Sequence, residues 1–321
     1  MADRRLIVYP DAEDTVSKLF TGARLARLEG LGRFEIAYGR PTAPEDFLAH
    51  MSEAHALLLG WNLPVEVLRK AANLEVVSFI GMGVGNFVDL GEAARLGITV
   101  CRTESAAEAV AEHTLALMLN AARHIGRLDR DLRAGIWNVS LPGMDLRGKT
   151  LGLVGFGRVA QATTPLARAF GMRVLAWTRN PSAARAAEHG VEFAELDRVL
   201  AEADVLALMV PVTPETDGLL DAERLGRTKP GVVLVNTARA QLVDEAAMLA
   251  LLRSGHIAAA GIDVFPEEPL APGHPLTALD NVVLTPHTAY NTPEASEAMI
   301  DMAIANIEAF YDGRPTNVAT V

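Results

Sequence analysis

The chain of 321 residues contains a single cysteine, Cys101, only 5% aromatic residues and no cluster of basic residues. A lone cysteine excludes an intrachain disulfide and agrees with a reducing compartment, so we predict a cytoplasmic protein. The 29 Lys and Arg residues are outnumbered by 40 Asp and Glu residues, and the formal net charge is −11. A chain of this charge lacks the electrostatic footprint of proteins that bind nucleic acid or anionic membranes, so any anion-binding site must be local.

Long hydrophobic runs are also absent. The N-terminal run, Leu6 to Tyr9, has four apolar residues and is too short for the core of a signal peptide. No run approaches the ~18 apolar residues of a membrane span. We find no low-complexity tract and no repeat of fixed period. The 50% of hydrophobic residues is typical of a globular protein, and the length predicts about two domains.

Short apolar runs alternate with stretches rich in Ala, Leu and Arg. Most of these runs are continuously apolar, as in parallel strands covered on both faces, so we predict an α/β fold with two doubly wound parallel sheets. Helices are expected between the strands, and the last one begins with Thr292 as N-cap and Pro293 as first helical residue. The predicted strands are 6–9, 56–60, 75–80, 98–102, 149–156, 173–177, 204–210, 231–237, 258–264 and 281–286, and the predicted helices include 13–29, 64–72, 105–127 and 292–313.

A glycine-rich turn, Gly155-x-Gly157-x-x-Ala160, lies where strand 149–156 ends and the next helix begins. Gly155 permits a tight turn, Gly157 lets the backbone approach a pyrophosphate, and Ala160 keeps the helix close to the sheet. The pyrophosphate would lie at the helix N-terminus, where free N–H groups favour an anion. Strand 173–177 completes a βαβ unit, so the pattern predicts dinucleotide binding; the alternative is a glycine turn that only packs a helix.

The end of strand 173–177 carries Thr178, Arg179 and Asn180 where an NAD-binding unit has an Asp or Glu for the ribose. An acid there would repel the 2′-phosphate of NADP. Thr178 removes this repulsion, and the guanidinium of Arg179 suits a phosphate. We therefore predict that NADP(H) is favoured, with NAD(H) as the alternative cofactor. The competing interpretation is that Arg179 is an ordinary solvated charge and the site accepts both.

Three later strands are followed by Arg239, Glu268 and His287, respectively. Strand ends in a doubly wound sheet line one edge, so these side chains are expected to converge. They suit hydride transfer between a 2-hydroxy acid and its 2-oxo acid. The arginine would bind the carboxylate, the histidine would exchange the hydroxyl proton, and the glutamate would fix the histidine ring. Taken singly, each residue type at such a place is more often structural or solvated.

Seven segments, in order along the chain, resemble the D-isomer-specific 2-hydroxyacid dehydrogenases, a family that includes glyoxylate/hydroxypyruvate reductases. The resemblance implies that Arg239, Glu268 and His287 are catalytic. It also implies that residues 1–100 plus 289–321 form a flavodoxin-like substrate domain, that residues 101–288 form an inserted Rossmann cofactor domain, and that the site lies between them. A homodimer through helix 105–127 and no metal are implied as well. The segments are 81–90, 109–119, 149–161, 210–220, 236–249, 259–270 and 284–290.

The predicted cofactor contacts follow these segments. Asp263 is expected at the carboxamide of the nicotinamide, although a carboxylate at a strand end also caps turns. His113 is expected to pack or hydrogen-bond locally, outside the site. The predicted cofactor-binding residues are Gly155, Phe156, Gly157, Arg158, Val159, Thr178, Arg179, Asn180, Val210, Pro211, Thr216, Thr237, Ala238 and Asp263.

The substrate is expected to be a small 2-oxo acid such as glyoxylate or hydroxypyruvate, a choice that follows only from the resemblance. Its carboxylate would be bound by Arg239 and by backbone N–H groups of the glycine-rich loop 81–85, unless that loop is an ordinary turn. Trp61 either lines the pocket or belongs to the core, and Tyr290 and Asn291 depart from the small residues that the resemblance implies. The predicted substrate-binding residues are Trp61, Met82, Gly83, Val84, Arg239 and His287.

Two other functions compete with this one, and the longer phosphoglycerate dehydrogenases are not expected. Formate and phosphite dehydrogenases share the fold, but the longer N-terminal region of such formate dehydrogenases is lacking here. The longer, regulated phosphoglycerate dehydrogenases carry a further domain after the last helix. Dinucleotide-sensing co-repressors belong to a different class, and the chain has neither their long disordered tails nor a basic run.

Overall fold

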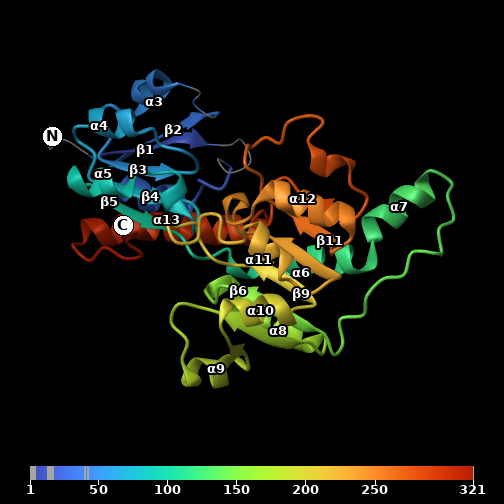
Figure 1. Cartoon of the computed structure of the whole chain (residues 1–321). Coiled ribbons are helices and arrows are strands. Elements are labelled where there is room, and N and C mark those ends of the chain that lie inside the picture. The colour runs from blue at the N-terminus through green and yellow to red at the C-terminus, as the bar shows by residue number, and fades with distance from the viewer. Residues whose placement is uncertain (1–4, 13–17, 40, 42, 321) are drawn as a thin grey trace. The chain divides into compact units, whose positions relative to one another are not determined.

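A computed structural model of the chain describes residues 5–12, 18–39, 41 and 43–320. The chain divides into two compact units, Met1–Ala106 with Thr292–Val321 and Ala107–Asn291. Each unit contains one parallel sheet with helices on both faces (Figure 1). The predicted α/β class with two doubly wound parallel sheets is therefore confirmed. No helix among the described residues is long and apolar enough to cross a bilayer.

The first unit has a five-stranded sheet in the order β2-β1-β3-β4-β5, which is the flavodoxin-like order. Its edge strand β2 was not predicted, because its residues are half-buried or exposed and form no apolar run. The strands are β1 (Leu6–Ala12), β2 (Arg33–Tyr38), β3 (Ala56–Leu59), β4 (Val76–Phe79) and β5 (Thr99–Arg102). The helices are α2 (Ala23–Leu31), α3 (Pro44–Met51), α4 (Val65–Lys70), η1 (Val84–Asn86), α5 (Leu90–Arg95) and α13 (Pro293–Tyr311).

Two helix predictions in this unit have different outcomes. The hydroxyl of Thr292 accepts a hydrogen bond from the Ala295 N–H at 3.1 Å and caps α13 as expected. The helix expected at 13–29 is wrong in its first part, because α2 begins only at Ala23 and residues 18–22 are not helical. Residues 13–17 lie outside the described residues.

The second unit has a seven-stranded sheet in the order β12-β11-β10-β9-β6-β7-β8, with every pair parallel. This is the Rossmann order with a seventh strand added beside the sixth. The strands are β6 (Thr150–Val154), β7 (Arg173–Trp177), β8 (Glu192–Phe193), β9 (Val205–Leu208), β10 (Val232–Asn236), β11 (Ile257–Ile262) and β12 (Val282–Leu284). The helices are α6 (Ala107–Arg123), α7 (Ile125–Arg133), α8 (Arg158–Ala169), α9 (Ala183–His189), α10 (Leu196–Glu202), α11 (Ala222–Gly226), η2 (Ala240–Leu242), α12 (Glu245–Ser254) and η3 (Pro275–Ala278).

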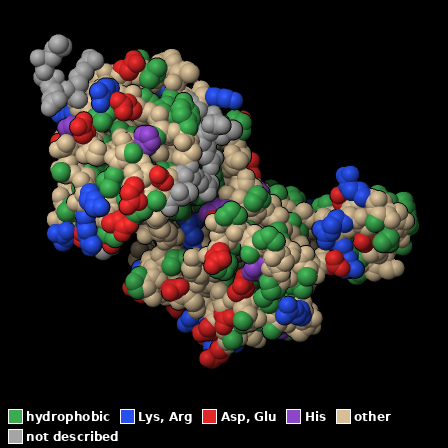
Figure 2. Space-filling view, turned by 90° about the horizontal axis from the view of Figure 1, so that it is seen from above, with side chains coloured by type: hydrophobic (Ala, Val, Ile, Leu, Met, Phe, Trp, Pro, Cys, Tyr) green, Lys and Arg blue, Asp and Glu red, His purple; other side chains and the backbone are tan. Residues whose placement is uncertain are grey.

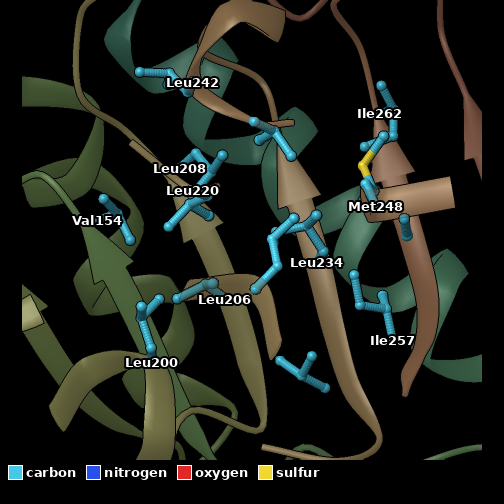
Figure 3. Close-up of a cluster of buried hydrophobic side chains, with 14 of the residues drawn as sticks. Val154, Leu200, Leu206, Leu208, Leu220, Leu234, Leu242, Met248, Ile257 and Ile262 are labelled. Carbon is cyan, nitrogen blue, oxygen red and sulfur yellow. The ribbon is translucent and has the colours of Figure 1, made fainter. Parts of the chain in front are cut away.

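Alternate residues of these strands point to opposite faces and build two apolar cores. Leu206 and Leu208 of β9 point to the face covered by α10, α11 and α12. On this face Leu200 lies near Leu206, and Met248 lies beside Ile262 of β11 (Figure 3). Val205 and Ala207 of β9 point to the opposite face, which α6 and α8 cover. Burial on both faces explains why the strands read as continuous apolar runs in the sequence.

One helix was expected over residues 105–127, but the chain breaks into α6 and α7 at His124. This residue has a left-handed backbone, with φ 54°. Nine residues of α6 are buried, and the helix packs on β10, β11 and β12. No residue of α7 is buried. The apolar pattern continues across the break, which is why the sequence alone read as a single helix.

Candidate active site

The glycine-rich turn between β6 and α8 has the geometry that close approach of a ligand requires. Gly155 has φ 106°, and a Cβ placed on it would lie 2.5 Å from the Met209 carbonyl oxygen, so only glycine fits. A Cβ on Gly157, the N-cap of α8, would meet no atom within 4 Å and would project into open space. Ala160 is fully buried against the sheet. The turn thus leaves the helix N-terminus open to a pyrophosphate.

Phe156, between the two glycines, anchors this turn through its side chain. Its ring is buried and makes edge contacts with the rings of His189 and Phe193 at centroid distances of 5.4 and 5.1 Å. Its carbonyl oxygen accepts a hydrogen bond from Arg185 Nη2 at 3.0 Å. Arg158 and Val159 form the first turn of α8.

The residues after β7 lie beside the loop that follows β9. Thr178 is half-buried, whereas Arg179 and Asn180 are exposed. Arg179 Nη2 donates a long hydrogen bond to Thr213 Oγ1 at 3.4 Å. The hydrogen bond from Thr213 lowers the pKa of Glu215, and the charge of Arg179 lowers it further. Two segments predicted to bind the cofactor are therefore adjacent.

The loop after β9 is held by the side chain of Thr216, which is buried. Its hydroxyl donates to the Pro211 carbonyl oxygen at 2.7 Å and accepts from the Thr213 N–H at 2.8 Å. Val210 is also buried, whereas Pro211 is exposed. The Thr216 side chain thus stabilises the loop itself, and the loop presents Pro211 at its surface.

His287 and Glu268, which follow β12 and β11, form a hydrogen-bonded pair in the second unit. His287 Nδ1 lies 2.7 Å from Glu268 Oε2, and Glu268 Oε1 accepts a hydrogen bond from the Phe265 N–H at 3.0 Å. Both oxygens of the carboxylate therefore have partners that fix its orientation. The pairing at Nδ1 leaves Nε2 as the ring nitrogen that can exchange a proton with a substrate.

Arg239 follows β10 and lies close enough to Glu268 for the charge of that carboxylate to act on its guanidinium. Burial lowers the pKa of its guanidinium from the ordinary value, and the nearby carboxylate of Glu268 opposes this shift. Its loop is fixed by Asn236, whose side chain donates to the Arg239 carbonyl oxygen at 2.9 Å and accepts from the Ala238 N–H at 3.0 Å. The three residues predicted to be catalytic thus lie after three adjacent strands at one edge of the sheet.

Asp263, at the end of β11, binds the turn that carries His287. Its side chain is fully buried, and Oδ1 accepts from Thr285 Oγ1 at 2.6 Å and from the Thr288 N–H at 2.9 Å. Oδ2 accepts from the Ala289 N–H at 3.0 Å. His287 itself has φ 49°, and its N–H donates to the Asp263 carbonyl oxygen at 2.7 Å. The Asp263 carboxylate already accepts three hydrogen bonds from this turn. The predicted contact with a nicotinamide would therefore need a lone pair of the carboxylate that these bonds do not use.

Tyr290 lies next to the pair of His287 and Glu268. Its ring makes an edge contact with the His287 ring at a centroid distance of 6.3 Å. Asn291 is exposed. The bulky ring at position 290 therefore borders the side chain predicted to transfer the proton, which identifies Tyr290 as a residue that can shape the substrate pocket.

The residues predicted on the substrate side lie at the carboxyl ends of β3 and β4 in the first unit. The Trp61 N–H donates to Asp11 Oδ2 at 2.6 Å, and the Gly60 N–H donates to the same buried carboxylate at 3.0 Å. Met82 and Gly83 are half-buried, and the Val84 side chain is buried. Sequence reasoning missed Asp11, although a carboxylate at the end of an apolar strand is the same signal that singled out Asp263.

Comparisons with known proteins identify the family. The family model for the D-isomer specific 2-hydroxyacid dehydrogenase NAD binding domain matches residues 115–289. A glyoxylate reductase of Aeropyrum pernix is 38% identical over 97% of this chain and 93% of its own length. The structure of an NADPH-dependent glyoxylate/hydroxypyruvate reductase from Sinorhizobium meliloti, in complex with NADP and malonate, is 30% identical, with a TM-score of 0.85 over 99% of this chain and 97% of that one.

A D-3-phosphoglycerate dehydrogenase of Mycobacterium leprae is 44% identical over 78% of this chain. The chain matches only 48% of the length of that relative. The identity to full-length glyoxylate reductases and the family match over more than half of the chain lead to the same assignment. The chain belongs to the D-isomer specific 2-hydroxyacid dehydrogenases, a family of oxidoreductases.

Proposed function

We propose that the protein interconverts a small 2-oxo acid and its D-2-hydroxy acid by hydride transfer, and that glyoxylate or hydroxypyruvate is its substrate. The observation that carries this proposal is the 2.7 Å distance between His287 Nδ1 and Glu268 Oε2. The charge of Glu268 also acts on the guanidinium of Arg239. The second unit is then the cofactor domain and the first unit the substrate domain. The buried thiol of Cys101 is in keeping with a cytoplasmic location.

Each residue of the trio has a defined chemical role. A bound nicotinamide cofactor supplies the hydride to C2 of the oxo acid, or accepts it in the reverse direction. Arg239 binds the substrate carboxylate through its planar guanidinium. His287 Nε2 donates a proton to the substrate oxygen during reduction and takes it back during oxidation. Glu268 holds the ring through its contact with Nδ1, which leaves Nε2 for the exchange of the proton.

The substrate carboxylate has a second candidate site in the glycine-rich loop after β4. Backbone N–H groups of Met82, Gly83 and Val84 suit a carboxylate oxygen, because consecutive N–H groups in a turn form an anion-binding concavity. The buried side chain of Val84 anchors this loop to the core. Trp61 would border the substrate from the end of β3.

NADP(H) is the cofactor that the residues after β7 favour. Thr178 replaces the acid that would repel a 2′-phosphate, and Arg179 presents an exposed guanidinium beside Thr213. Arg179→Ala is expected to raise KM for NADPH about tenfold while KM for NADH changes little. Arg173→Ala, which removes the same charge at the other end of β7, is the matched control. Equal effects of Arg179→Ala on both cofactors would contradict the preference.

The substrate is tested by following NADPH absorbance with glyoxylate, hydroxypyruvate and pyruvate. Oxidation of NADPH with glyoxylate or hydroxypyruvate at the highest kcat/KM supports the proposal, and no oxidation with any 2-oxo acid refutes it. 3-Phosphoglycerate with NAD⁺ or NADP⁺ is assayed in the same series, because one relative at 44% identity is a D-3-phosphoglycerate dehydrogenase. A preference for this acid would keep the family assignment and overturn the proposed substrate.

A homodimer was predicted through helix 105–127, and we propose that the dimer contact lies farther along the chain. Nine of the 17 residues of α6 are buried within its own unit. The segment 125–139 exposes Ile125, Leu132, Ile136, Trp137 and Val139, with Trp137 and Val139 80% exposed. α7 lies at the right edge of Figure 1, and at the same edge Figure 2 shows hydrophobic side chains beside basic and acidic ones. A second copy of the chain would cover this apolar surface.

A further inference from the structure

Helix α6 carries two consecutive polar residues, His113 and Thr114, that contact the loops of the residues proposed to act on the substrate. His113 Nε2 lies 3.0 Å from Thr285 Oγ1, two residues before His287. Thr114 Oγ1 lies 2.8 Å from Thr237 Oγ1, two residues before Arg239. The same turn of one helix therefore reaches both strand ends.

The first contact belongs to a chain of hydrogen bonds whose direction follows from the available protons. The Thr285 hydroxyl has one proton and donates it to Asp263 Oδ1 at 2.6 Å. It must then accept from His113, so His113 carries a proton on Nε2. Asp263 also accepts from the Thr288 and Ala289 N–H groups on the far side of His287. The chain from His113 through Thr285 to Asp263 thus holds both ends of the turn in which His287 adopts its left-handed backbone.

The second contact also has a fixed direction. Thr114 donates its hydroxyl proton to the Val110 carbonyl oxygen within α6 at 2.8 Å, so the Thr237 hydroxyl donates to Thr114. This bond attaches the loop after β10 to the helix, while Asn236 closes the same loop from inside. The backbone just before Arg239 is therefore held from two sides.

Close packing makes α6 a rigid support for these contacts. A Cβ placed on Gly261 of β11 would lie 2.8 Å from Leu117 Cβ, so the helix lies directly against the strand that ends at Asp263. Leu117 is one turn along the helix from His113, and it is buried. The helix cannot shift relative to the sheet without losing this packing.

We infer that His113 and Thr114 are positioning residues of the active site: His113 sets the place of His287 through Thr285 and Asp263, and Thr114 sets the place of Arg239 through Thr237. The inference rests on the proposed function, because it takes His287 as the proton-transfer residue and Arg239 as the carboxylate-binding residue. It differs from the expectation that His113 packs or hydrogen-bonds locally, outside the site. It also gives Asp263 a role in holding the His287 turn.

The two residues have different expected kinetic effects. His113→Leu removes the donor to Thr285 and is expected to lower kcat about 10- to 100-fold, because displacement of a reacting group by about 1 Å costs that much. KM for the 2-oxo acid and Kd for NADPH are expected to change by less than about twofold. His113→Gln retains an N–H donor and is expected to recover most of kcat.

Thr114→Val removes the hydroxyl at constant volume and is expected to raise KM for the 2-oxo acid about tenfold, with a smaller fall in kcat. Thr114→Ser restores the hydroxyl and is expected to restore KM. The opposite split, with His113→Leu acting on KM and Thr114→Val on kcat, would overturn the assignment of the two residues.

His256→Leu is the matched control, because His256 Nε2 lies 3.0 Å from Thr228 Oγ1 at the amino-terminal edge of the same sheet. It is expected to lower Tm about as much as His113→Leu while leaving kcat and KM unchanged. If His113→Leu also leaves kcat unchanged, or if neither conservative variant restores activity, the inference is wrong. His287→Ala separates the two claims: an active His287→Ala refutes the proposed function, whereas an inactive one with normal His113→Leu and Thr114→Val refutes only the positioning roles.

Discussion

Alanine at the two glycines of the nucleotide loop is expected to have different effects. Gly155→Ala should mainly lower stability, and Gly157→Ala should mainly weaken cofactor binding. At Gly155 the new Cβ would lie 2.5 Å from the Met209 carbonyl oxygen and 2.9 Å from the Val210 nitrogen. These are backbone atoms of the loop directly after β9 and cannot move freely. The positive φ of 106° costs about 1–3 kcal/mol for a residue with a side chain. Overpacking costs about 1–3 kcal/mol more.

Gly155→Ala is therefore expected to destabilise the second unit by about 2–6 kcal/mol, out of a domain stability of about 5–15 kcal/mol. For a unit of this size the loss corresponds to a fall in Tm of roughly 5–20 °C. Gly157→Ala places its Cβ in open space at a negative φ and changes only the N-cap, at about 0.5–1 kcal/mol. Its Cβ would, however, stand where the backbone must approach a pyrophosphate, so Kd for NADPH is expected to rise at least about tenfold.

The assays are differential scanning calorimetry without cofactor and fluorescence titration with NADPH. The reasoning predicts a large fall in Tm for Gly155→Ala and a nearly unchanged Tm with weak binding for Gly157→Ala. If Gly157→Ala binds NADPH with the affinity of the parent protein, the loop does not bind the pyrophosphate. If the two variants lose the same Tm, the contact of residue 155 with β9 does not constrain the turn.

The remaining predictions concern four substitutions. His287→Ala is expected to lower kcat by about 10²–10⁴ with unchanged Kd for NADPH. Arg239→Ala is expected to raise KM for the 2-oxo acid and also to slow turnover. Steady-state kinetics and fluorescence titration check both variants, and full activity of either one would count against the role of that residue. Trp137→Ala is expected to weaken the proposed dimer by at least about 2 kcal/mol, measured by sedimentation velocity, and an unchanged association would exclude this surface. The hydrogen bond from Arg24 lowers the pKa of Asp301 from its ordinary 3.8, so the ionised pair stabilises the first unit above that pH and this contribution is lost as pH falls through the lowered pKa. Asp301→Asn should cost about 0.5–1 kcal/mol at neutral pH and nothing at the acid end of a Tm profile, and a pH-independent difference would refute the linkage.

The strand series and the polar residues at strand ends could be predicted from the sequence, because both leave a local signature. A parallel strand covered on both faces must be apolar throughout, as β9 and β10 are. The chain must then turn polar where the strand ends, and this placed Arg239, Glu268 and His287 at one edge. Strand β2, which is only partly buried, has no such signature and was missed.

The break of α6 at His124 could not be predicted from the local pattern. The helical pattern continues across it, and the nearest glycine, Gly126, lies inside α7 and not at the break. A histidine in the left-handed region is uncommon, and only packing of α6 on the sheet shows where the buried helix ends and the exposed one begins.

The sequence by itself determined the fold class, the nucleotide turn at Gly155 and Gly157 and the order in which the site residues occur, because each depends on residues within about one strand and one turn. Only the tertiary structure decided which side chains support the site. His113 and Thr285 are 172 residues apart, and Thr114 and Thr237 are 123 residues apart. Hydrogen bonds between such distant residues depend on the register of β10, β11 and β12 and on how closely α6 lies against Gly261. No local pattern encodes that geometry, because it arises only when the packed sheet and helix bring the polar atoms within reach of each other.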